Sequence, residues 1–249
     1  MLREDTVFGP IFSRRLGSSL GINLLPREGK LCNFDCIYCE CGWNRDGLAD
    51  RWIPRVADVR EALEAKLREC SAGNIGIDSI TFSGDGEPTL NPDFPEIVDA
   101  TLELRDRYYP SAVVSVLTNA TRIARDRVFA ALCKVDNPIL KLDAPRTEWA
   151  RLINQPAGDY EVSAVVEAMK RFNGNFVLQT MFLKAPGFRS GDWAGEWMDI
   201  VRALKPREVM VYTIDRPVPM AGLEKYTAEE MRALVQPLLD EGFKIQIKG

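Results

Sequence analysis

Strand-like and helix-like hydrophobic patterns alternate along this chain of 249 residues. Between the strand-like runs, apolar side chains recur at helical spacing, as at Val59, Leu63 and Leu67. Strands that alternate with helices connect in parallel through right-handed crossovers, so the pattern predicts an α/β fold with a parallel six-stranded sheet. The pattern alone allows a partial barrel or an open doubly wound sheet. The expected strands cover residues 21–25, 77–82, 112–117, 139–142, 176–182 and 209–213.

Further helices are expected over residues 97–108, 162–172 and 193–204. The last helix has signals at both ends. Thr227 and Glu230 have the spacing of a capping box, in which each side chain satisfies a backbone donor. Gly242 is expected to close that helix.

Three of the six cysteines lie in one short segment, Cys32-Asn-Phe-Asp-Cys36-Ile-Tyr-Cys39. Three thiolates from one loop can hold three irons of a four-iron cluster and leave the fourth iron open for chemistry. Structural zinc is the alternative, but zinc sites usually come as paired clips and this chain has no histidine. We therefore predict that Cys32, Cys36 and Cys39 are the only cluster ligands and that Cys41 is not one.

The two remaining cysteines, Cys70 and Cys133, are expected to be small core residues on apolar helical faces. They are too few and too far apart to supply a second cluster. A disulfide framework is excluded by the length of the chain and the clustering of its cysteines.

A second motif follows the strand-like run that ends at Phe82, and reads Ser83-Gly-Asp-Gly-Glu-Pro88. Its glycines, Gly84 and Gly86, allow close backbone approach because they have no Cβ. Glu87 supplies a carboxylate at the end of a predicted strand, where parallel barrels place their reactive groups. The motif therefore predicts a binding site.

Together the two motifs resemble the radical S-adenosylmethionine (radical SAM) superfamily. Its cysteine motif has an aromatic residue before the third cysteine, here Tyr38, and its Gly-Gly-Glu motif matches Gly86 and Glu87 with Asp85 in place of the first glycine. Asn119 resembles a further element, Thr-Asn-Gly, with Ala120 replacing the glycine. Residues 9–22 resemble the branch related to wyosine-type tRNA synthases.

The resemblance implies one radical SAM core domain over residues 1–249, with an N-terminal extension (1–20) and a partial (β/α)6 barrel (21–249). It implies a [4Fe-4S] cluster, S-adenosyl-L-methionine as a second cofactor, and an electron donor such as flavodoxin or ferredoxin. Reductive cleavage would give a 5′-deoxyadenosyl radical that abstracts hydrogen from a substrate. Glu87 would receive the ammonium group of S-adenosylmethionine. The residues expected to bind the cofactor are Tyr38, Gly84, Asp85, Gly86, Glu87, Asn119, Lys141, Asp143 and Gln179.

Several of these positions have a structural alternative. Lys141 and Asp143 share one face of a strand, where they can contact the cofactor or form an ion pair. Asn119 can be a turn cap, and Gln179 is an amide in an apolar strand that needs a partner. The candidate substrate residues are Arg14, Arg15, Tyr212 and Arg216.

The composition bears on location and on partners. The net charge is −4, so a globally basic surface for nucleic acid is absent. The charged start and the lack of a membrane-length apolar run predict a cytoplasmic enzyme with no membrane partner. RNA, a peptide and a small molecule remain open as substrates. The alternatives are wyosine-type tRNA base modification, a glycyl-radical activase, and a non-catalytic metal-binding module.

Overall fold

The computed structural model describes residues 5–13, 16–47 and 52–249. The candidate substrate residues Arg14 and Arg15 lie outside the described residues. The chain forms two compact units. Unit 1 contains Met1–Asn33, Trp43–Thr118 and Ala124–Pro138, and unit 2 contains Phe34–Gly42, Asn119–Ile123 and Ile139–Gly249.

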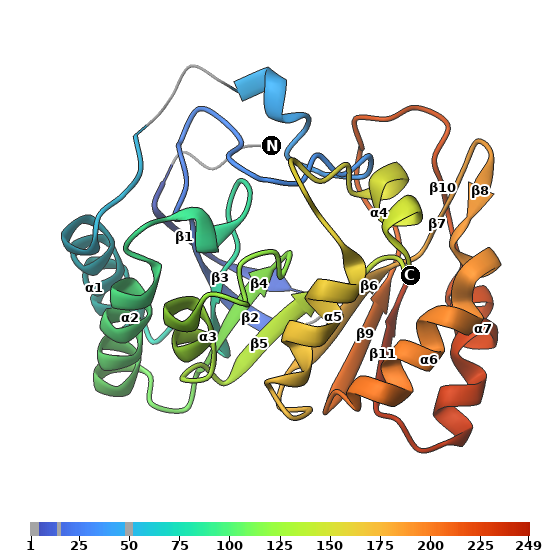
Figure 1. Cartoon of the computed structure of the whole chain (residues 1–249). Helices are drawn as coiled ribbons and strands as arrows, with labels where there is room; N and C mark the ends of the chain where they lie inside the picture. The colour runs from blue at the N-terminus through green and yellow to red at the C-terminus, as the bar shows by residue number, and fades with distance from the viewer. Residues whose placement is uncertain (1–4, 14–15, 48–51) are drawn as a thin grey trace. The chain divides into compact units, whose positions relative to one another are not determined.

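Unit 1 contains the whole of strands β1, β2, β3 and β4 (Figure 1). Strand β1 pairs antiparallel with β2, whereas β2, β3 and β4 pair in parallel. Helices α1 and α2 pack side by side, and α2 also contacts α3. The elements are β1 (Val7–Ser13), β2 (Gly17–Ile22), η1 (Asn44–Gly47), α1 (Val56–Ala72), β3 (Ser79–Phe82), η2 (Pro88–Leu90), α2 (Phe94–Tyr108), β4 (Val113–Thr118) and α3 (Asp126–Leu132).

The two faces of the unit 1 sheet differ in chemistry. Ile80 and Phe82 of β3 are fully buried apolar residues on one face. On the other face, buried hydroxyls bond to one another: Ser79 Oγ lies 3.0 Å from Thr81 Oγ1 on the same strand and 3.1 Å from Ser115 Oγ on β4. Each hydroxyl can donate one bond and accept another, so these buried groups satisfy one another.

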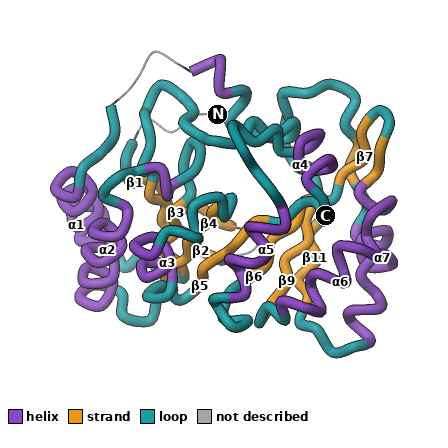
Figure 2. The backbone as a smooth tube through the Cα atoms, in the orientation of Figure 1, coloured by secondary structure: helices purple, strands orange, loops and turns teal. Residues whose placement is uncertain are grey.

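Unit 2 holds most of β5 together with three further parallel strands, β6, β9 and β11. A small antiparallel sheet has the order β10-β7-β8. Figure 2 shows the helices of this unit in purple and its strands in orange. The elements are β5 (Asn137–Lys141), α4 (Thr147–Ile153), α5 (Val162–Lys170), β6 (Val177–Met181), β7 (Leu183–Ala185), β8 (Phe188–Arg189), η3 (Ser190–Trp193), α6 (Ala194–Leu204), β9 (Glu208–Tyr212), β10 (Glu224–Lys225), α7 (Ala228–Asp240) and β11 (Ile245–Lys248).

Each of the six predicted strands overlaps an observed strand, namely β2, β3, β4, β5, β6 and β9, but β2 shares only residues 21 and 22 with the predicted range 21–25. The sequence interpretation missed β1, β11 and the small sheet, as well as the short helix α4. The capping box of α7 is confirmed, since Glu230 N donates to Thr227 Oγ1 and Thr227 N donates to Glu230 Oε2. Gly242 follows that helix with a φ of +87°, as expected for a closing glycine.

The two remote cysteines have different outcomes. Cys70 is fully buried on α1, as predicted. The prediction for Cys133 is wrong: α3 ends at Leu132, and Cys133 follows it as an exposed residue. The apolar spacing in the sequence therefore extends one residue beyond the end of α3. No helix among the described residues is long and apolar enough to cross a membrane.

Candidate functional site

Glu87 is a buried carboxylate in unit 1, directly before the short helix η2. Its Oε1 accepts hydrogen bonds from Thr89 N at 3.1 Å, Thr89 Oγ1 at 2.5 Å and Thr118 Oγ1 at 2.7 Å. Thr118 is the last residue of β4, so two neighbouring strand ends of the sheet contribute to this contact. These three donors are neutral, and they fix the carboxylate group without cancelling its charge.

Gly86 brings the Glu87 motif against the residue that precedes Cys32. Leu31 N donates to Asp85 O at 2.9 Å, and Glu87 N donates to Leu31 O at 3.0 Å. Gly86 has a φ of +140°, and a Cβ at this position would lie 1.9 Å from Leu31 O. Only glycine allows this approach. The two sequence motifs are thus joined by backbone hydrogen bonds within unit 1.

Asp85, which departs from the superfamily pattern, is held by a second side chain. Asn23 Nδ2 lies 3.4 Å from Asp85 Oδ2, and Asp85 N donates to Asn23 Oδ1 at 3.2 Å. A Cβ at Gly84 would lie 2.0 Å from that same Asn23 oxygen. Gly84 is therefore needed for the approach of Asn23, a residue that the sequence interpretation missed.

In unit 2, Lys141 and Asp143 form the ion pair that the sequence left as an alternative, with Nζ and Oδ2 3.7 Å apart. Lys141 Nζ also lies 3.0 Å from Tyr38 Oη and 2.9 Å from Tyr212 Oη. The Tyr38 hydroxyl donates to Asp143. The structure thus brings together four of the predicted site residues.

Burial and charge shift the protonation of this group. Burial alone would lower the pKa of Lys141, but Asp143, Tyr212 and Cys36 together outweigh it and hold that pKa above its ordinary value. Burial and the charge of Asp143 both raise the pKa of Tyr38. The ammonium form of Lys141 and the neutral phenol of Tyr38 are therefore stabilised together.

Cys36 lies beside the same group. Burial raises the pKa of its thiol to about 11, and the positive charge of Lys141 opposes this rise. Asn154 Nδ2 lies 3.4 Å from Cys36 Sγ. Two backbone turns shape the segment, because Cys39 N donates to Cys36 O and Gly42 N donates to Cys39 O, both at 3.0 Å.

Gln179 lies on β6 in register with Lys141 of β5 and Met210 of β9. Its side chain is buried, and Nε2 has no hydrogen-bond partner among the described residues. A buried amide donor without a partner is costly, so this position fits contact with a bound group.

Three other candidates have structural contacts. Asn119 Oδ1 accepts from Thr121 N at 3.1 Å and from Thr121 Oγ1 at 2.7 Å, which is the turn-cap arrangement. Arg216 Nη1 lies 2.8 Å from Glu40 Oε2, so Arg216 contacts the cysteine segment. Tyr212 contacts Lys141 as described above.

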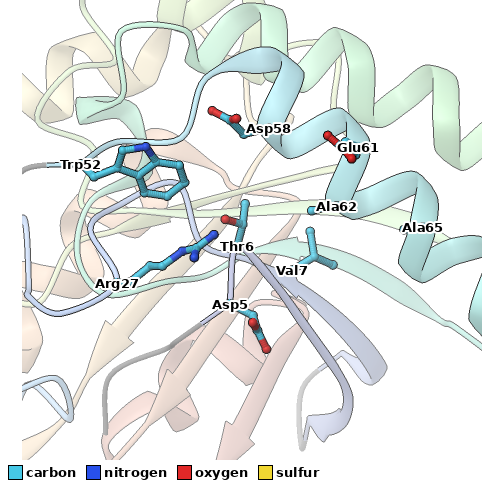
Figure 3. Close-up of a pocket in the computed structure, with 9 residues that line it drawn as sticks. All are labelled: Asp5, Thr6, Val7, Arg27, Trp52, Asp58, Glu61, Ala62 and Ala65. Atoms are coloured by element: carbon cyan, nitrogen blue, oxygen red, sulfur yellow. The ribbon is translucent and has the colours of Figure 1, made fainter.

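A pocket of about 410 Å³ lies in unit 1 (Figure 3). Arg27 extends alongside Trp52, with its guanidinium carbon 4.7 Å from the ring centroid. Helix α1 contributes the carboxylates of Asp58 and Glu61. No residue that the sequence motifs predicted lines this pocket. The lining residues are Asp5, Thr6, Val7, Arg27, Trp52, Asp58, Glu61, Ala62 and Ala65.

A family model described as the radical SAM superfamily matches residues 29–185, which contain both motifs and the Lys141–Asp143 pair. The chain belongs to the radical SAM superfamily. Radical SAM proteins are enzymes that use a [4Fe-4S] cluster and S-adenosylmethionine, so the enzyme class and the cofactors predicted from the resemblance are confirmed.

Curated relatives include two UPF0026 proteins. The chain is 30% identical over 220 residues to slr1464 of Synechocystis, covering 86% of this chain and 77% of the relative. It is 33% identical over 183 residues to MJ1312 of Methanocaldococcus jannaschii, covering 71% of this chain and 53% of the relative. A match to "GTPase Obg" of Brachyspira hyodysenteriae has 30% identity over 234 residues and covers 92% of this chain. The chain spans 33% of that relative's length, and about half of the Methanocaldococcus one.

Solved structures of radical SAM enzymes share the fold. A radical SAM methyltransferase from Sphaerobacter thermophilus matches with a TM-score of 0.71 and 15% identity, over 95% of this chain and 67% of that one. Streptococcus suis SuiB bound to S-adenosylmethionine matches with a TM-score of 0.66 and 19% identity, over 92% and 50%. TYW1 with a lysine-pyruvate adduct matches with a TM-score of 0.65 and 15% identity, over 92% and 76%. These matches confirm the predicted fold class, the α/β partial barrel.

Proposed function

We propose that this radical SAM enzyme uses its reduced cluster to cleave S-adenosylmethionine reductively, giving a 5′-deoxyadenosyl radical that abstracts hydrogen from a substrate. The observation that carries the proposal is the backbone pairing of Leu31 with Gly86. It joins the start of the cysteine segment to the buried Glu87 carboxylate.

Cys32, Cys36 and Cys39 fit the role of cluster ligands. Thiolates are the usual protein ligands of iron–sulfur clusters, and three of them leave one iron position for another group. The arrangement of Cys36 beside a lysine and an amide donor suits a bound thiolate, because both groups stabilise negative charge on sulfur.

Glu87 is proposed to hold the ammonium group of S-adenosylmethionine. Its hydroxyl and amide donors orient the carboxylate, and a carboxylate can accept a charge-assisted hydrogen bond from an ammonium group. Gln179 is proposed to donate its buried Nε2 hydrogens to an acceptor on the cofactor. Tyr38, Lys141 and Asp143 would shape the same part of the site through their mutual hydrogen bonds.

The remaining roles follow from the superfamily. The backbone of Gly84, Asp85 and Gly86 and the side chain of Asn119 are proposed to contact the cofactor. Tyr212 and Arg216 are proposed to contact the substrate. An electron donor such as flavodoxin or ferredoxin, in the cytoplasm, would supply the reducing electron. RNA, peptides and small molecules are the substrate classes to be compared.

The test is anaerobic reconstitution with iron and sulfide, followed by detection of 5′-deoxyadenosine by mass spectrometry. Wild-type protein should show the visible absorption of one four-iron cluster and should release deoxyadenosine from S-adenosylmethionine. Cys36→Ala should lose both signals. Stimulation of deoxyadenosine formation by one candidate compound class would identify the substrate.

Cys41→Ala is the matched control, because Cys41 lies in the same segment and should keep most of the cluster absorption. Loss of the cluster in this variant alone would overturn the ligand assignment. A cluster that forms but never cleaves S-adenosylmethionine, with any reductant, would overturn the proposed function.

A further inference from the structure

Asn154 links a proposed cluster ligand to a buried carboxylate. Its side-chain nitrogen Nδ2 lies 3.4 Å from Cys36 Sγ and 2.7 Å from Asp143 Oδ2. All three residues belong to unit 2 and are buried, Asn154 with 2% of its surface exposed. One primary amide thus contacts a sulfur and a carboxylate at once.

The chemistry of Asp143 fixes which way this amide points. An ionised carboxylate only accepts hydrogen bonds, so the amide nitrogen of Asn154, and not its oxygen, must face Asp143. The other oxygen of Asp143 accepts from Met181 N at 2.9 Å, which holds the carboxylate in place. Because the amide nitrogen carries two hydrogens, one can bond to Asp143 and the second to Cys36 Sγ.

Backbone hydrogen bonds also hold Cys36 next to Asn154. Asp35 N donates to Asn154 O, and Ile37 N donates to Ile153 O, both at 2.9 Å. These carbonyls belong to the end of α4, where helix carbonyls have no partner within the helix. The residues on both sides of Cys36 are therefore bonded to the end of α4, and the distance from Nδ2 to Sγ is set by the fold.

We infer that Asn154 is a positioning residue that tunes the reduction potential of the cluster through Cys36. The inference rests on the proposed function, since it requires Cys36 to be a ligand. A hydrogen bond to a ligating sulfur draws negative charge from it, which stabilises the more negative, reduced state of the centre. Asn154 thereby raises the reduction potential of the cluster, so that the cluster accepts an electron more readily.

The first test is Asn154→Leu, which removes the donor and keeps a side chain of similar size. The cluster content should remain that of wild type. The equilibrium constant for reduction should fall about tenfold, which corresponds to about 59 mV toward more negative potential for one electron. Asn175→Leu, at an exposed asparagine of the same unit, should leave the potential unchanged. Equal potentials in Asn154→Leu and wild type would overturn the inference.

A second test uses the wild-type chain and does not depend on the variant folding. Protein labelled with ¹⁵N only in its asparagine side-chain amides should show coupling of ¹⁵N to the reduced cluster in pulsed electron paramagnetic resonance. The coupling should persist in Asn44→Ala, because Asn44 Nδ2 donates to the backbone oxygen of Cys32. A cluster without such coupling would overturn the role of Asn154 alone, whereas a wild-type chain that takes up no cluster would overturn the proposed function as well.

Discussion

Two buried polar clusters among the described residues, one in each unit, are built in different ways. The Glu87 cluster, in unit 1, consists of Glu87 with the donors Thr89 and Thr118. The Asp143 cluster, in unit 2, consists of Asp143 with Lys141, Tyr38, Tyr212 and Asn154. In the first, threonine donors bond to the carboxylate, whereas the second pairs a carboxylate with a buried ammonium.

This difference separates a binding role from a structural role. Thr89 and Thr118 orient the Glu87 carboxylate, and a carboxylate can accept a charge-assisted hydrogen bond from an ammonium group. Asp143 is paired with Lys141, and both its oxygens accept hydrogen bonds from protein groups. Substitutions in the Glu87 cluster should therefore act mainly on ligand binding, and substitutions in the Asp143 cluster mainly on stability.

The largest effect is expected from Asp143→Ala. Removing one partner of a buried ion pair leaves the other charge uncompensated, which costs about 3–5 kcal/mol of unfolding free energy. Denaturant unfolding of the apoprotein measures this loss. Asp159→Ala removes an exposed carboxylate of the same unit and should change stability by less than about 0.5 kcal/mol. Similar losses of unfolding free energy in the two variants would contradict the structural role of Asp143.

Gly86→Ala should be the next most severe change, with a loss of about 3 kcal/mol from backbone strain and overpacking. The added Cβ would meet Leu31 O at 1.9 Å. Gly158→Ala is the matched control, since its φ is +69° but no atom lies within 4 Å of an added Cβ. The control should show only the cost of about 1–2 kcal/mol for a left-handed alanine. Equal losses would show that the Leu31 contact contributes nothing.

Glu87→Gln tests the binding half of the comparison. The amide oxygen can still accept the hydrogen bonds from the threonines, so stability should change little. The affinity for S-adenosylmethionine should fall about tenfold, because a hydrogen bond to a charged group contributes about 1.5–3 kcal/mol. Calorimetry on the anaerobic holoprotein measures the affinity, with the exposed Glu69→Gln as control. Unchanged affinity for S-adenosylmethionine would show that Glu87 has a structural role and not a binding role.

The smallest effect concerns alkaline pH. The folded protein raises the pKa of both Lys141 and Tyr38, so these groups hold their protons longer when folded than when unfolded. Their contribution to stability is complete below the unfolded pKa values, about 10 to 10.4, and is lost as pH rises beyond them. Tyr38→Phe should therefore lose stability less steeply than wild type as the pH rises from about 9.5 to about 11, a range that spans the unfolded pKa of tyrosine. An identical slope would contradict this coupling.

The sequence revealed Glu87 because it is contiguous with Gly86, whereas its donor Thr118, 31 positions away, was not predicted. Gly86 and Glu87 form a motif, and the motif itself signals close backbone approach. Asn154 gave no signal, since an asparagine after a short helix is common and its partners are 11 and 118 positions away along the chain. Tertiary contacts of this kind depend on the packing of distant segments.

Secondary structure was missed for related reasons. Strand β11 (Ile245–Lys248) is short, and its residues are only partly buried, so its pattern is weak. Cys133 was misplaced because apolar spacing does not report where a helix ends. The longer helices α1 and α6 were predicted well because each has a sustained apolar stripe.

The pairing of Leu31 with Gly86 has a consequence for protein engineering. Residue 31 and residues 85–87 each donate and accept a hydrogen bond in this contact. In an engineered chain, both segments should therefore be taken from the same parent protein. A chimaera that received the cysteine segment of a relative, but not that relative's glycine motif, would combine the two segments of this β-bridge from different proteins. Recombination points between radical SAM enzymes are therefore better placed before residue 29 or after η2 than between the two motifs.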